Sequence, residues 1–159
     1  MRNINVGTRS GLKDSSLNNL LVCALLFCIG DSMDNYYMSI AIKLAYKAYR
    51  KGEVPVGAVI VKDNKILSTA YNKKNKTKRT IDHAEILAII KANKKLHDWR
   101  LNDCIMYVTL KPCDMCIGAL KESRISKIIY ASDTSCCSNS IECIQLNDEK
   151  INKESSGLL

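Results

Sequence analysis

Four side chains in two short segments have the types and spacing of a metal centre that could do chemistry. One residue separates His83 from Glu85, and two residues separate Cys113 from Cys116. A catalytic zinc ion takes three protein ligands and keeps a fourth position for water. We therefore expect His83, Cys113 and Cys116 to hold Zn²⁺, and the Glu85 carboxylate to stay free as an acid and base.

The spacing also predicts how helices position these residues. The two cysteines, three apart, would share one face of a helix, and Pro112 suits the first position of that helix. His83 and Glu85 would point to opposite sides inside a helix, so they can converge only at its start. Asp82 is the expected N-cap there. A helix N-terminus also favours the thiolate form of a cysteine.

Each piece of the pattern has a simpler interpretation. The Cys-x-x-Cys pair could be a redox pair or half of a structural zinc site. Glu85 could only close a capping box with Asp82, and His83 could be an ordinary core histidine. None of these explains why all four residues occur together, so the joint pattern favours a catalytic zinc site.

The composition is that of one globular domain. The 159 residues and 47% hydrophobic content allow a sizeable core. The net charge of +8 favours a polyanionic partner, although a solvated lysine surface needs no ligand. Eight cysteines could indicate a secreted disulfide scaffold. A zinc site needs reduced thiols, however, which favours a reducing compartment such as the cytoplasm, the nucleus or an organelle.

The N-terminal segment differs from the rest of the chain. We expect residues 1–34 to be an extension in front of a catalytic domain of residues 35–159. The apolar run at 20–29 is too short to span a bilayer, so no membrane partner is expected. It resembles the apolar part of a signal peptide, and two interpretations stay open: a targeting sequence or a disordered extension.

The hydrophobic pattern predicts the elements that must position the ligands. We expect helices over residues 35–50, 83–96 and 113–123, and strands over 56–62, 65–72, 105–109 and 127–131. The first two strands should form an antiparallel hairpin, and the later ones, which follow helices, should be parallel. This order predicts an α/β fold, a three-layer α/β/α sandwich with a mixed sheet.

Three local expectations accompany this fold. The helix over 83–96 is apolar almost all round, which predicts packing on both sides. The polar tail from Asn147 should be frayed. Residues 73–79 carry five positive charges just before His83, and we expect a basic loop near the mouth of the metal site. From charge alone a solvated loop is the simpler interpretation, and RNA binding is the alternative.

Several segments, one of which contains the two cysteines of the metal motif, carry a resemblance to a known family. They are Gly-Glu-Val-Pro-Val-Gly-Ala-Val at 52–59, Tyr-Asn at 71–72, Trp-Arg-Leu at 99–101, Tyr-Val-Thr-Leu at 107–110, residues 112–119 and Ser-Arg-Ile at 123–125. The His-x-Glu and Pro-Cys-x-x-Cys pattern is itself typical of zinc-dependent nucleobase deaminases. Over residues 37–130 the chain resembles the tRNA adenosine deaminases, which have the cytidine-deaminase-like fold.

The resemblance implies hydrolytic deamination of adenosine to inosine at the anticodon wobble position of tRNA. It also implies a homodimer, or a heterodimer with a related deaminase subunit. A zinc ion would activate water, and Glu85 would carry the proton to the base. By the same resemblance Asn72 would contact the base or ribose, and Pro55, Val56 and Leu110 are expected to line the pocket.

The chain departs from the family pattern at several places. Lys111 stands where the family usually has Glu, the loop after Tyr130 is shorter, and the C-terminal helix is weak or truncated. Two other functions therefore stay open. One is a deaminase of a free base or nucleotide, such as guanine or deoxycytidylate, and the other is a non-catalytic subunit that presents tRNA. Glu85 argues against the second.

Overall fold

The computed structural model describes residues 33–133 and 142–159. Its helices are α2 (Met33–Tyr49), α3 (Lys74–Thr77), α4 (Ala84–Leu96), α5 (Asp114–Glu122) and α6 (Glu149–Ser156). Its strands are β1 (Gly57–Lys62), β2 (Lys65–Tyr71), β3 (Ile105–Leu110), β4 (Lys127–Ser132) and β5 (Cys143–Gln145). Residues 1–32 of the expected extension lie outside the described residues. No described helix combines the length and apolar character needed to cross a membrane.

The strands form one mixed sheet in the order β2-β1-β3-β4-β5. β1 pairs with β2 in the expected antiparallel hairpin, whose turn residues Asp63 and Asn64 have left-handed φ values of 49° and 56°. This backbone matches the twist of a two-residue hairpin. β1 also runs antiparallel to β3, whereas β3, β4 and β5 are parallel. The expected mixed sheet is confirmed.

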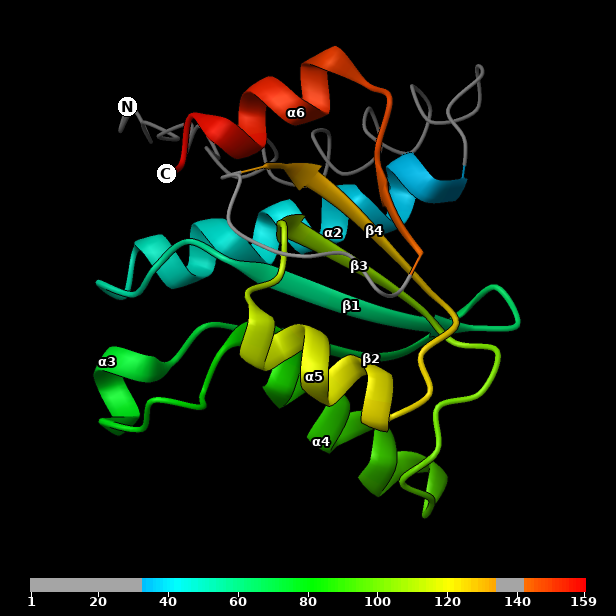
Figure 1. The fold of residues 1–159 in the computed structure, drawn as a ribbon. Helices are drawn as coiled ribbons and strands as arrows, with labels where there is room; N and C mark the ends of the chain where they lie inside the picture. Colours follow the sequence, from blue (N-terminus) through cyan, green and yellow to red (C-terminus); the bar gives the residue numbers. More distant parts are fainter. Residues whose placement is uncertain (1–32, 134–141) are drawn as a thin grey trace, which may run out of the picture. The chain divides into compact units, whose positions relative to one another are not determined.

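Two helical layers cover the sheet, with α2 and α6 on one face and α4 and α5 on the other (Figure 1). Alternate residues of the strands pack into two hydrophobic cores, one on each face of the sheet. In β1, Ala58 and Ile60 join the core under α4 and α5, whereas Val59 and Val61 join the core under α2. Because both faces are covered, the inner strands are continuous apolar runs. The three-layer α/β/α sandwich is confirmed.

The C-terminal tail is helical, so the expectation that it is frayed is wrong. α6 is capped by the Asp148 side chain, which accepts a hydrogen bond from the Ile151 N–H at 3.0 Å. The buried Ser155 hydroxyl donates to the Thr109 carbonyl at 2.8 Å, which fastens α6 to the end of β3. A cap and a tertiary hydrogen bond therefore stabilise a segment whose polar composition predicts no packing.

The expectation that α4 packs on both sides is also wrong. Its sheet-facing side is lined by alanines at four-residue intervals, Ala84, Ala88 and Ala92, all fully buried. Ile90 on the other side is 49% exposed. The small alanine side chains let the helix approach the sheet closely, and Ile86, Leu87 and Ile90 are partly or largely exposed to solvent.

Candidate metal centre

The three expected ligands come together where α4 and α5 begin. His83 is the N-cap of α4, Cys113 is the N-cap of α5, and Cys116 lies in the first turn of α5. The two helices pack side by side on the same face of the sheet (Figure 1). The starts of these two helices therefore bring residues about thirty positions apart in the sequence to one place.

The donor atoms are spaced like the corners of a zinc tetrahedron. The Nδ1 of His83 lies 3.7 Å from the Cys113 Sγ and 3.6 Å from the Cys116 Sγ, and all three atoms lie within 4.8 Å of one another. Zinc bonds of about 2.3 Å to sulfur and about 2.0 Å to nitrogen, at tetrahedral angles, place nitrogen and sulfur about 3.5 Å apart. The residues present therefore fit a zinc ion held by one nitrogen and two sulfurs, with a fourth position open.

Burial and neighbouring charges shift the pKa values of two of the expected ligands. Burial, followed by the charges of Glu85 and Cys113, raises the pKa of the Cys116 thiol. Burial and the Lys74 ammonium lower the pKa of His83, so its imidazole is neutral and able to ligate near pH 7. A divalent cation between the sulfurs would reverse the first effect, because it stabilises the thiolates.

Glu85 lies beside the ligands and is only 4% exposed. Its carboxyl interacts with the Cys116 thiol and with its own backbone N–H. Burial raises the pKa of the carboxyl, and these two interactions partly oppose that rise. His83, not Asp82, is the N-cap of α4, so Glu85 is not at the third helical position that a capping box requires. The capping interpretation of Glu85 is therefore wrong.

Both helices begin one residue later than expected, because the ligand residues themselves have extended backbones. The ψ angle is 155° at His83 and 168° at Cys113. Pro112 consequently precedes the N-cap of α5 and is not its first helical residue. Asp82 does not cap α4. Its carboxylate is buried, lies 3.5 Å from the Arg79 Nε, and has one oxygen without a hydrogen-bond partner in the described structure.

The basic segment at 73–79 contains the short helix α3 and is anchored by two side chains. The Asn72 Oδ1 accepts a hydrogen bond from the Lys74 N–H at 3.0 Å. The Glu53 carboxylate accepts from the Asn75 N–H at 2.8 Å and from the Lys76 N–H at 2.7 Å. The expectation of a plain loop is therefore wrong, since three successive amides of this turn are held in place.

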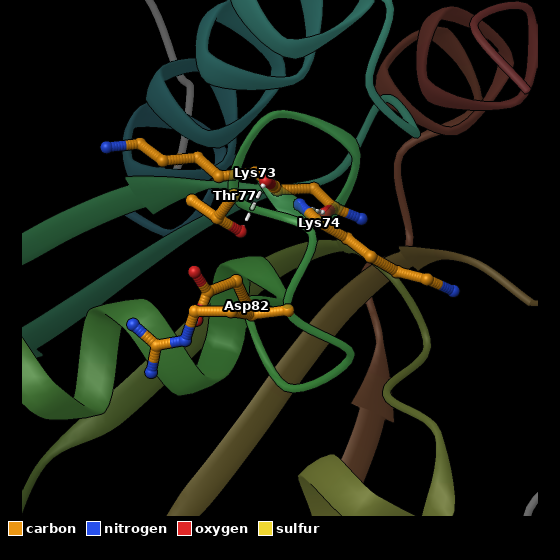
Figure 2. Close-up of polar contacts among 6 residues, drawn as sticks. Lys73, Lys74, Thr77 and Asp82 are labelled. Carbon is orange, nitrogen blue, oxygen red and sulfur yellow. Dashed lines mark hydrogen bonds and ion pairs between the residues drawn. The ribbon is translucent and has the colours of Figure 1, made fainter.

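The start of the basic segment is tied to the residue before the first ligand. The Lys73 N–H donates to the Asp82 carbonyl at 3.0 Å, and the Thr77 hydroxyl donates to the Lys73 carbonyl at 2.9 Å. The side chains of Lys73 and Lys74 extend in opposite directions (Figure 2). Lys74 is near enough to the metal centre for its charge to lower the pKa of His83.

The four residues expected at the substrate lie just before β1, at the end of β3 and just after β2. Val56 is buried in the core under α4 and α5, and Leu110 packs against that core. Pro55 is half-buried just before β1. Asn72 is 4% exposed, and its N–H donates to the Val56 carbonyl at 3.0 Å. Within the described residues, the Nδ2 of Asn72 donates to no protein acceptor.

Lys111, where the family usually has Glu, forms an ion pair at the end of β3. Its ammonium lies 3.1 Å from the Asp133 carboxylate and 5.8 Å from the centre of the Tyr130 ring. Only 12% of the Lys111 side chain is exposed. The positive charge just before Pro112 is therefore balanced by an acidic residue at the end of β4.

Sequence reasoning missed Glu53 as a functional candidate. It is 6% exposed, yet its carboxylate has two backbone partners more than twenty residues away. The available signal was a single acidic residue inside the apolar segment at 52–59. A carboxylate in such a segment must be buried with partners or turned to solvent.

Residues 31–132 match the family described as the cytidine and deoxycytidylate deaminase zinc-binding region. A tRNA-specific adenosine deaminase of Bacillus subtilis (strain 168) is 46% identical over 101 residues, which cover 64% of this chain and 63% of that protein. The chain thus spans less than two thirds of this relative's length.

Two solved structures share the fold and are also similar to this chain in sequence. One comes from studies of A-to-I editing by tRNA:A34 deaminases at the wobble position of transfer RNA. It is 27% identical, with a TM-score of 0.70, and the match covers 79% of this chain and 99% of that chain. The other is a guanine deaminase from Bacillus subtilis. It is 37% identical, with a TM-score of 0.61, and the match covers 62% of this chain and 64% of that chain. Because the matched range at 31–132 includes both ligand segments and four of the five strands, the chain belongs to the zinc-binding cytidine and deoxycytidylate deaminase family.

Proposed function

We propose that this chain is a zinc-dependent hydrolase that converts adenosine to inosine at the anticodon wobble position of tRNA. The observation that carries the proposal is a buried carboxyl, Glu85, beside three donor atoms spaced for zinc. The name of the Bacillus subtilis relative supports adenosine in tRNA as the substrate. The five positive charges at 73–79 support a nucleic acid as the partner.

In this proposal His83 Nδ1 and the sulfurs of Cys113 and Cys116 hold the zinc ion. The bound ion supplies an electropositive centre that makes a water molecule nucleophilic near neutral pH. Glu85 takes a proton from this water as the water oxygen adds to C6 of adenine, and it returns protons to the base so that the amino group leaves as ammonia. One water is consumed and one ammonia released, so no further reactant is needed. Burial raises the pKa of Glu85, which helps the carboxyl hold the proton between the two transfers.

Asn72 would orient the substrate through its amide nitrogen. Its Oδ1 already accepts the Lys74 N–H, so Nδ2 is the atom left to donate to an acceptor on the base or ribose. Pro55, Val56 and Leu110 would provide apolar contacts to the purine. Anticodon bases are unpaired, so placing one of them in a pocket needs little unstacking.

A second candidate is deamination of a free base, because the guanine deaminase structure is 37% identical over the part it covers. A free base carries no phosphate and gains nothing from the basic turn at α3. A non-catalytic subunit that presents tRNA is the third candidate, and the buried Glu85 argues against it. Deoxycytidylate is a further small substrate that this fold class accommodates.

The test is a direct comparison of substrates with the full-length, zinc-loaded protein. Transfer RNA, adenosine, guanine and deoxycytidylate are incubated separately, and the products are measured by mass spectrometry. We expect inosine in tRNA and little conversion of the small molecules. Xanthine from guanine, with tRNA unchanged, would replace the proposal by the second candidate. No product from any substrate would favour the presenting subunit.

Glu85→Gln tests the proton-transfer role within the same assay. General acid–base catalysis contributes about a hundred- to ten-thousand-fold in rate, and here one residue serves both transfers, so the loss should reach the upper end. Zinc content and tRNA affinity should be retained. Glu122→Gln, an exposed glutamate at the end of α5, is the matched control and should keep the wild-type rate. An active Glu85→Gln protein with a lowered melting temperature would overturn the catalytic assignment.

We further propose that the chain works as a dimer, with itself or with a related subunit. The family resemblance supports this, as do the large apolar side chains that the outer layer exposes on α4 and α5, Ile90 at 49% and Met115 at 37%. Light scattering should give a mass well above the 17.8 kDa of one chain. A single-chain mass at concentrations where the protein is active would contradict the homodimer.

A further inference from the structure

A row of lysines follows the outer edge of the sheet along β2. β2 is an edge strand, so some of its carbonyl groups point outward without a strand partner. The Lys95 ammonium donates to the Leu67 carbonyl at 3.2 Å, and the Lys91 ammonium donates to the Thr69 carbonyl at 2.6 Å. Both lysines come from α4 and remain exposed to solvent. Two ammonium groups therefore lie side by side on this edge.

Two more lysines continue the row at the end of β2. The ammonium groups of Lys47 and Lys73 each lie 5.3 Å from the centre of the Tyr71 ring. Lys47 belongs to α2 and Lys91 to α4, and these helices cover opposite faces of the sheet (Figure 1). Both helical layers therefore contribute positive charge to one edge. We call Lys47, Lys73, Lys91 and Lys95 the β2-edge lysines.

Within the part of the chain that the structure describes, no acidic side chain forms an ion pair with a β2-edge lysine. The ion pairs among the described residues join Arg79 to Asp82, Arg100 to Asp98 and Lys111 to Asp133, and none includes a β2-edge lysine. Burial lowers the pKa of Lys91, and the charges of Lys73 and Lys47 lower it further. Gathered like charges of this kind repel one another and are stabilised by a bound polyanion.

We propose that the β2-edge lysines bind the phosphate backbone of RNA. The identity of this RNA as the substrate tRNA rests on the proposed function. The basic turn connects this edge to the metal centre, because the Lys73 ammonium lies over the Tyr71 ring while the Lys74 ammonium is near enough to His83 to lower its pKa. A backbone whose target base sits at the metal centre would meet Lys74 first and then continue along β2.

A structural role is the alternative that the experiment must separate. Lysines on an edge strand discourage pairing with other chains, and the hydrogen bonds to Leu67 and Thr69 suit that role. Edge protection predicts that removal of the lysines promotes association of the protein and leaves its RNA affinity unchanged. RNA binding predicts instead that removal of the lysines lowers RNA affinity and leaves the association state of the protein unchanged.

The experiment measures tRNA affinity of the full-length, zinc-loaded protein as a function of salt. Lys47, Lys73 and Lys91 are replaced together by Gln. The control replaces Lys62, Lys121 and Lys127 by Gln, which removes the same charge outside β2, at the end of β1, the end of α5 and the start of β4. Each neutralised phosphate contributes about 0.7 to 0.9 to the slope of log affinity against log salt. Between 50 and 200 mM salt, wild-type affinity should therefore fall about 20- to 40-fold more than that of the edge variant, whereas the control should follow the wild type.

The outcomes separate this inference from the proposed function. If wild-type protein forms inosine in tRNA but the edge variant keeps the wild-type salt slope, the inference is wrong and the function stands. If the salt slope of the edge variant is flatter but the wild-type protein forms no inosine in tRNA, the edge binds RNA and the proposed function fails. Light scattering on both variants tests edge protection, and association of the edge variant with unchanged affinity would also overturn the inference.

Discussion

Replacing Gly57 by Ala should destabilise the protein, because β1 begins in direct contact with the backbone of α2. A Cβ at this position would collide with the Ala41 carbonyl oxygen and lie 2.8 Å from both the Ala45 nitrogen and the Leu44 Cβ. Two of these three atoms are helix backbone, so relief requires α2 to move away from the sheet. The Gly57 N–H also donates to the Thr109 hydroxyl at 3.2 Å, which limits movement on the strand side.

The magnitude follows from the cost of overpacking a close-packed interior. Such insertions typically cost about 1–3 kcal/mol, and a backbone obstacle favours the upper part of that range. For chains of about 150–250 residues, each kcal/mol lowers the melting temperature by about 2–4 °C. We therefore expect Gly57→Ala to melt about 4–12 °C below the wild type in calorimetry of the zinc-loaded protein.

Gly118→Ala is the matched control, since it adds the same methyl group in open space. Gly118 lies within α5, and outside its chain neighbours and the adjacent helix backbone no atom would lie within 4 Å of its added Cβ. Alanine is favoured over glycine inside a helix by about 1 kcal/mol, so this variant should melt slightly higher than the wild type. If Gly57→Ala melted at or above the wild-type temperature, the close approach of α2 to β1 would be wrong.

Three further predictions concern the metal, the pH response and the N-terminus. Cys113→Ala should remove most of the bound zinc in elemental analysis, and undiminished zinc would exclude Cys113 as a ligand. The Tyr107 hydroxyl donates to the Asp34 carboxylate at 2.6 Å, and burial followed by this interaction raises its pKa above the ordinary 10.0. The neutral phenol therefore contributes fully to stability below pH 10 and loses that contribution as pH rises. Tyr107→Phe should flatten the fall in unfolding free energy at alkaline pH, and an unchanged dependence of that free energy on pH would contradict this. A protein that starts at Met33 should retain wild-type zinc content and deamination, and a lowered rate would show that the extension takes part.

Most of the fold follows from hydrophobic periodicity. The strands at 57–62, 105–110 and 127–132 are apolar on both faces because helices cover both, and continuous apolar runs are easy to recognise. β5 has only three residues, too few for any periodicity to emerge. α6 depends on hydrogen bonds of Asp148 and Ser155, which composition does not reveal.

The metal centre is predictable for a different reason, since ligand chemistry restricts which residues can serve. His, Cys and Cys at the starts of two helices come together as expected, although each helix begins one residue late. The role of Glu53 is not predictable in the same way, because its partners are backbone amides of Asn75 and Lys76. Every residue except proline has such an amide, so side-chain types give no signal.

The anchoring of α3 by Glu53 and Asn72 has an entropic consequence. Fixing the backbone of one residue costs about 1–2 kcal/mol, so ordering the four residues Lys74–Thr77 would take roughly 4–8 kcal/mol from any binding event that had to impose it. Here the fold imposes that order, and the lysines of the turn are presented from a fixed frame. A flexible basic tail of equal charge would adapt to many polyanions, whereas a rigid turn favours only those whose phosphates already match its shape.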